Sequence, residues 1–127
     1  MTELTDLDVR RIVDYLQQQR AGMVALLQRL VLTESSSEDA TGLGRVLAIL
    51  TAELKSSVMT VRRLPGRISG SLVFARQRQG PARTPFQLLV GHCDTVWPAG
   101  TLGTMPMRAE NGIITGPGVF DMKAGLV

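Results

Sequence analysis

The spacing of the apolar residues changes about halfway along the chain, and this change constrains the fold more than any other feature. In the first half, apolar side chains recur every three or four residues over 6–31 and over 42–56, which predicts two helices. In the second half, Val58–Val61 and Ser71–Ala75 show the alternation of strands. The chain is therefore expected to contain both helices and strands.

Local signals support the two helices. Thr5 followed by Asp8 is typical of a capping box at the start of the first one. Gly22 could kink or divide that helix. The polar stretch Glu34–Asp39 is expected to be a loop between the two helices.

Three further segments are predicted in the last third of the chain. Phe86–Val90 is a nearly continuous apolar run, as expected of a strand that is central and buried on both faces in a complete sheet. In residues 1–127 alone, its edge and its apolar face are expected to be exposed. Asn111-Gly112 is a turn signal and predicts a hairpin between residues 108–110 and 113–115. Asp121–Val127 has the pattern of a helix that has just begun, so the sequence is expected to be truncated.

The composition is that of one globular domain or a part of one. The chain has 127 residues, of which 44% are apolar and 20% charged, and a formal net charge of +3, which argues against disorder. No apolar run reaches the roughly 18 residues that a membrane helix needs, and the polar N-terminus is unlike a secretory signal. Cys93 is the single cysteine, so no internal disulfide can form. A cytoplasmic protein without a membrane partner is expected.

The basic residues are distributed unevenly. No acidic residue lies between Glu53 and Asp94, whereas seven basic residues do. They could form a nucleic-acid face or a solvated hairpin whose charges discourage edge pairing. Only Phe74 and Phe86 could stack on bases there, which favours the hairpin and a protein without a nucleic-acid partner. The seven basic residues are Lys55, Arg62, Arg63, Arg67, Arg76, Arg78 and Arg83.

The strongest candidate for a functional segment is Gly91–Val96, with the sequence GHCDTV. His92 is the only histidine of the chain. At a strand end, His92 and Asp94 would project to the same side, where a carboxylate can hold an imidazole whose other nitrogen binds a metal. The alternative is a hydrogen-bonded histidine beside a turn-forming aspartate, and spacing alone favours it. Cys93 would point to the opposite face, so a small buried residue is expected there rather than a nucleophile.

Asp121 is the second candidate. It follows the irregular segment Gly116–Gly118, at the point where a loop enters a predicted helix. The simplest interpretation is an ordinary helix N-cap. The glycines do not have the spacing G-x-x-x-x-G-K, which excludes a phosphate-binding loop of that kind.

Together the two segments resemble a known family in order and separation. It is the family of co-catalytic zinc metallopeptidases and amidohydrolases that includes glutamate carboxypeptidase, acetylornithine deacetylase, succinyl-diaminopimelate desuccinylase and the aminoacylases. Its pattern is an apolar strand with G-H-x-D-T-V, then P-F-x-x-x-x-G-x-x-Y-G-x-G, then D-M-K-G-G. The corresponding segments here are Leu88–Val96, Pro106–Arg108, Gly112–Gly118 and Asp121–Gly125, and Trp97–Leu102 is most similar to the glutamate carboxypeptidase branch.

The resemblance implies a fold, an activity and a set of roles. Residues 1–127 would be the N-terminal third of a zinc-exopeptidase-like catalytic domain with an α/β fold, a mixed sheet with flanking helices. The activity would be hydrolysis of the amide bond of a peptide or N-acyl amino acid with two zinc ions, or with cobalt or manganese in their place. His92 would bind one zinc, Asp121 would bridge both, and Asp94 would be the catalytic-site carboxylate that clamps His92. The Asp121–Met122 peptide bond would be cis.

The chain also departs from the family pattern. Met107, Thr115 and Ala124 replace the usual Phe, Tyr and Gly, and none of them is a ligand position. The family's lid domain, its Glu-Glu pair with the general base, and its remaining ligands have no counterpart in residues 1–127.

Two ligands cannot complete two zinc sites, each of which needs about four donors. The chain alone is therefore expected to be inactive, and a homodimer formed through the lid would belong to the full-length protein. The alternatives are a non-catalytic remnant or interaction domain and, less favoured, a basic nucleic-acid-binding module.

Overall fold

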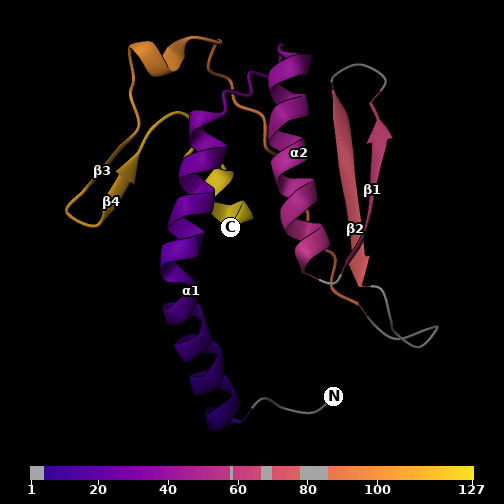
Figure 1. Cartoon of the computed structure of the whole chain (residues 1–127), viewed down its shortest axis with the longest axis vertical. Coiled ribbons are helices and arrows are strands. Elements are labelled where there is room, and N and C mark those ends of the chain that lie inside the picture. Colours follow the sequence, from indigo (N-terminus) through magenta and orange to yellow (C-terminus); the bar gives the residue numbers. More distant parts are fainter. Residues whose placement is uncertain (1–4, 58, 67–69, 78–85) are drawn as a thin grey trace.

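The computed structural model describes residues 5–57, 59–66, 70–77 and 86–127 (Figure 1). Two long helices are followed by two β-hairpins and short 3₁₀ turns, which confirms the predicted mixture of helices and strands. The elements are α1 (Asp6–Leu32), α2 (Ala40–Ser56), β1 (Met59–Pro65), β2 (Ser71–Gln77), η1 (Thr101–Gly103), β3 (Arg108–Glu110), β4 (Ile113–Thr115) and η2 (Lys123–Leu126).

Both helices begin at a side-chain cap. The predicted capping box of α1 is present, because the Asp8 backbone N–H donates to the Thr5 hydroxyl and the Thr5 backbone N–H donates to the Asp8 carboxylate. Helix α1 continues through Gly22 without a division. Helix α2 begins two residues earlier than predicted, because the Asp39 carboxylate accepts a 3.0 Å hydrogen bond from the Thr41 backbone N–H.

The strands form two separate antiparallel hairpins. In the first, β1 pairs with β2 in a register that runs from Met59↔Gln77 to Pro65↔Ser71, and the hairpin packs against α2. In the second, Asn111 and Gly112 both have positive φ, 52° and 79°, which is the geometry of the predicted two-residue turn between β3 and β4. Figure 1 shows the second hairpin beside α1 and the first beyond α2. Within the described ranges these hairpins stand in place of the single mixed sheet that the resemblance implied.

The prediction of a strand over Phe86–Val90 is wrong for this structure, whereas the exposed apolar surface expected for these residues in this chain is present. The segment has no assigned strand structure, and its side chains are exposed, Leu89 to 91% and Val90 to 82%. A strand apolar on both faces is stable only between neighbouring strands and covering layers. In the described part of the chain no strand pairs with this segment.

The core lies where the C-terminal half of α1 meets α2. Leu30 and Val46 are fully buried there, and Val73 of β2 packs against them from the first hairpin. Cys93 is also buried, with a free thiol, which confirms its predicted role as a small core residue. The buried members of this cluster are Leu30, Leu43, Val46, Leu47 and Cys93.

The basic region forms, in part, the predicted solvated hairpin. Arg62 and Arg63 on β1 and Arg76 on β2 are exposed. Three further basic residues of this region, Arg67, Arg78 and Arg83, lie outside the described residues. Among the helices of the described ranges, none is long and apolar enough to cross a membrane.

Candidate metal site

The loop after α1 holds the segment that carries His92. The Thr95 backbone N–H donates to the Ser35 carbonyl at 2.8 Å, and the Ser37 N–H donates to the Thr95 carbonyl at 3.0 Å. The buried Ser35 hydroxyl donates to the Cys93 carbonyl at 2.7 Å. A short parallel bridge to this loop, rather than the predicted strand end, therefore fixes the position of His92.

The other two predicted site residues, Asp94 and Asp121, lie on either side of the His92 imidazole. Its Nε2 lies 3.0 Å from Asp121 Oδ1, although the two residues are 29 positions apart in the chain. Its Nδ1 lies 3.2 Å from the Asp94 backbone carbonyl and 3.3 Å from the Asp94 carboxylate. The predicted juxtaposition of Asp94 with one ring nitrogen and Asp121 with the other is present. The His92 and Asp121 side chains lie closer together than predicted, since they meet at hydrogen-bond distance rather than across a gap of metal-site size.

Ser37 is a site residue that the sequence did not reveal. Its hydroxyl donates a 2.7 Å hydrogen bond to Asp94 Oδ2, while Asp94 Oδ1 faces His92. Ser37 thus fixes the rotation of the Asp94 carboxylate and, through it, the His92 ring. The polar stretch before α2 was the available signal, but only tertiary pairing shows which of its serines reaches Asp94.

The electrostatics of the site favour charged side chains. The hydrogen bond to Asp121 raises the pKa of His92, and the contact with the Asp94 carbonyl adds to the effect. The hydrogen bond from Ser37 lowers the pKa of Asp94. Because both neighbours of the ring are acceptors, the imidazole can donate to both only when each nitrogen carries a proton. A metal at Nε2 would replace one of these protons.

Asp121 lies on a tight loop that ends in η2. Gly118 in this loop has φ +73°, and a Cβ there would lie 2.4 Å from the Thr95 methyl group, so the loop requires glycine. The Asp121–Met122 peptide bond is cis, as the resemblance implied. The predicted helix after Asp121 is instead the 3₁₀ turn η2, which begins at Lys123.

A cavity of about 270 Å³ opens at the His92–Asp121 contact. Polar groups of Ser37, His92, Asp94 and Asp121 lie on one part of its wall, and apolar side chains form much of the rest. The apolar lining residues are Val96, Trp97 and Phe120.

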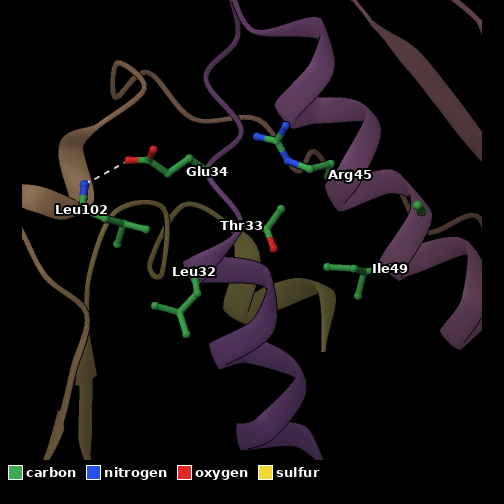
Figure 2. A pocket seen from close by; sticks show the side chains of 7 residues that line it. Leu32, Thr33, Glu34, Arg45, Ile49 and Leu102 are labelled. Carbon is green, nitrogen blue, oxygen red and sulfur yellow. Dashed lines mark hydrogen bonds between the residues drawn. The ribbon is translucent and has the colours of Figure 1, made fainter.

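A larger, open hollow of about 510 Å³ lies between the end of α1, α2 and η1 (Figure 2). Its wall contains none of the predicted site residues. Figure 2 shows Glu34 reaching across it to Leu102, where the carboxylate accepts the backbone N–H at 3.0 Å; the Gly100 N–H donates to the other oxygen at 2.8 Å. These hydrogen bonds lower the pKa of Glu34, and the one from Leu102 has the largest effect. Glu34 therefore fixes the loop that also carries Trp97.

The donor atoms suit zinc in kind but not in number. Imidazole nitrogen and carboxylate oxygen are common zinc ligands, and two ligand atoms about 2.1 Å from a tetrahedral zinc lie roughly 3.4 Å apart. His92 Nε2 and Asp121 Oδ1, 3.0 Å apart, would be the two atoms that hold the ion. Among the described residues no cluster of three or more His, Cys, Asp or Glu side chains is gathered for a metal. A complete coordination shell would therefore need donors beyond these two.

Comparison with known proteins gives a partial match to a carboxypeptidase. No family model matches the chain. Over 109 residues it is 31% identical to carboxypeptidase G2 from Pseudomonas sp. (strain RS-16). The alignment covers 84% of this chain and 26% of the relative, so the chain spans about a quarter of the length of the curated relative it matches. The chain is thus a distant, partial relative of a carboxypeptidase.

Proposed function

We propose that this chain supplies part of the metal-binding active site of a carboxypeptidase-type hydrolase, which cleaves the amide bond of a peptide or N-acyl amino acid. The observation that carries the proposal is the 3.0 Å contact between His92 Nε2 and Asp121 Oδ1. The family resemblance assigns these two residues as zinc ligands, and the similarity to carboxypeptidase G2 supports a peptidase-like hydrolase. Membership of the zinc metallopeptidase and amidohydrolase family is part of the proposal.

Each residue of the site has a role in this proposal. His92 binds the metal through Nε2, and Asp121 binds it through its carboxylate, one oxygen of which already faces that nitrogen. Asp94 holds the opposite side of the ring, and Ser37 holds Asp94. The chemistry that zinc supplies when bound is a water of lowered pKa and a polarised substrate carbonyl. Val96, Trp97 and Phe120, which line the cavity, offer an apolar contact surface to the substrate.

Zinc titration of the purified chain tests this function. We expect weak binding, because His92 and Asp121 are two donors of the roughly four that zinc takes. His92→Ala and Asp121→Asn should each abolish it. Asp14→Asn, which removes an exposed carboxylate on α1, is the matched control and should leave binding unchanged. Equal zinc affinity in wild type and His92→Ala would refute the proposal.

The second candidate function is a non-catalytic interaction domain. The observation that favours it is the exposed apolar segment Phe86–Val90, together with the absence of a three-donor cluster among the described residues. The same titration separates the two candidates. Zinc binding that depends on His92 and Asp121 supports the hydrolase site, whereas no binding to the folded chain supports the interaction domain.

A further inference from the structure

Lys123 is a buried cation that the site described above does not use. Its side chain is 1% exposed, and its Nζ donates hydrogen bonds to the carbonyls of Leu30 at 2.7 Å and Thr33 at 3.1 Å. These carbonyls belong to the C-terminal end of α1, where helix carbonyls lack intrahelical partners. The partial negative charge of a helix C-terminus also favours a cation there. Lys123 is thus a side-chain cap that comes from a distant part of the chain.

Burying an ammonium group is costly unless it is hydrogen-bonded. Burial lowers the pKa of Lys123. A methionine of similar length would fill the same space without desolvation of a charge. The only other lysine, Lys55, lies exposed in the last turn of α2. What lysine adds at this buried position, compared with methionine, is directed hydrogen bonds to the end of α1.

The loop that Lys123 anchors is the one that carries Asp121. The Lys123 backbone N–H donates to the Gly118 carbonyl at 2.9 Å, which closes the loop around Asp121. On the other side, the His92 backbone N–H donates to Met122 Sδ at 3.4 Å. The Asp121 side chain itself is 80% exposed. Packing does not hold this carboxylate, so its position depends on the anchors of its loop.

We propose that Lys123 is a positioning residue of the candidate metal site: by binding the C-terminal carbonyls of α1, it holds Asp121 opposite His92. The inference rests on the proposed function, in which these two side chains bind the metal. Lys123 is not among the residues that line the cavity at His92 and Asp121, so its effect on the site comes through the loop. Its removal should therefore change the His92–Asp121 contact before any metal is added.

The first experiment reads that contact without metal. His92 is the only histidine, so its ring gives a single set of side-chain NMR resonances. At one fixed acidic pH, Lys123→Met should shift the ring ¹⁵N and ¹³C resonances of His92 toward those of Asp121→Asn. Lys55→Met, the matched control, should leave them at the wild-type positions. Wild-type His92 resonances in a folded Lys123→Met chain would overturn the proposal.

The second experiment measures zinc affinity in the same variants. Loss of a group that orients a metal ligand typically costs about 10–100-fold in affinity, and we expect a loss in this range for Lys123→Met. Lys55→Met, the matched control, should leave zinc affinity at the wild-type value. If wild type binds zinc and Lys123→Met binds it equally well, the positioning role fails and the proposed function stands. If wild type binds no zinc but the His92 resonances still shift, the proposed function fails and the positioning role stands.

A third measurement covers the case in which Lys123→Met does not fold. Lys123→Arg keeps a cation with several hydrogen-bond donors, so its His92 resonances should lie at the wild-type positions. In the wild-type chain itself, the Lys123 Nζ protons should exchange slowly with solvent, unlike those of Lys55. Rapid exchange at Lys123 would contradict the anchor directly.

Discussion

Ser37 is the residue on which the orientation of Asp94 most depends. It connects the loop after α1 to a chain of contacts that runs from Ser37 through Asp94 and His92 to Asp121. Each member restricts the next, so a site built from exposed and half-exposed side chains has a defined geometry. Substitutions along this chain should have effects at the neighbouring residue rather than on the global fold.

Replacing Ser37 with alanine should raise the pKa of Asp94. The 2.7 Å hydrogen bond from the serine hydroxyl is the main cause of its lowered value, and alanine has no donor. Carboxyl ¹³C titration by NMR measures the change directly. Ser56→Ala is the control, because the Ser56 hydroxyl bonds only to a carbonyl at the end of α2. An unchanged Asp94 titration in Ser37→Ala would show that the hydroxyl does not hold the carboxylate in solution.

A second prediction for a single residue concerns the charge of His92. Asp121 raises the pKa of His92 in the folded chain above its ordinary value of about 6.5. The contact of protonated His92 with Asp121 should therefore stabilise the fold fully below about pH 6.5. This stabilisation should disappear as the pH rises through the folded-state pKa of His92. Asp121→Asn should lower the His92 pKa and flatten this dependence. NMR titration of the ring, with urea unfolding on both sides of neutrality, tests both; an unchanged His92 pKa in Asp121→Asn would contradict the contact.

At the scale of the elements, the two halves of α1 differ in how far their side chains are buried. Its C-terminal half is buried at Leu27, Leu30 and Val31, whereas Val9, Ile12 and other apolar residues of its N-terminal half are about half exposed. Figure 1 shows this half extending away from the core between α1 and α2. The stability of the helix should therefore be concentrated near the loop that holds the site.

Truncation of one leucine in each half measures this difference. Leu30→Ala removes a fully buried side chain and should lower the free energy of unfolding by about 2–5 kcal/mol. Leu16→Ala, on the exposed half of the same helix, should change it by no more than about 0.5 kcal/mol. Urea unfolding followed by circular dichroism gives both values. A large loss in Leu16→Ala would mean that the N-terminal half is covered in solution.

The elements that sequence predicted well are those that local interactions determine. The capping box at Thr5 and the Asn111-Gly112 turn involve neighbours in the chain, and the structure confirms both. The strand over Phe86–Val90 was predicted wrongly because a strand needs a partner, and an apolar pattern does not show whether one is present. The His92–Asp121 contact spans 29 residues, so spacing could not give it and only the family resemblance pointed to it.

For the molecule as a whole, the unusual property is the amount of exposed apolar surface. Phe86, Leu89 and Val90 are each more than 80% exposed in a continuous segment, and Phe120 at the site cavity is 97% exposed. Large contiguous patches of this kind mark interaction surfaces or aggregation hazards. An extended apolar segment without a paired neighbour also offers its backbone to another chain.

The chain should therefore associate as its concentration rises. Sedimentation velocity over a range of concentrations should show species larger than the 13.7 kDa monomer. Leu89→Lys should reduce association without loss of stability, because Leu89 is 91% exposed and contributes almost no buried area. Thr104→Lys adds the same charge at another exposed position and is the matched control. A monomer at every concentration, with a single cooperative melt, would show that this surface does not drive association.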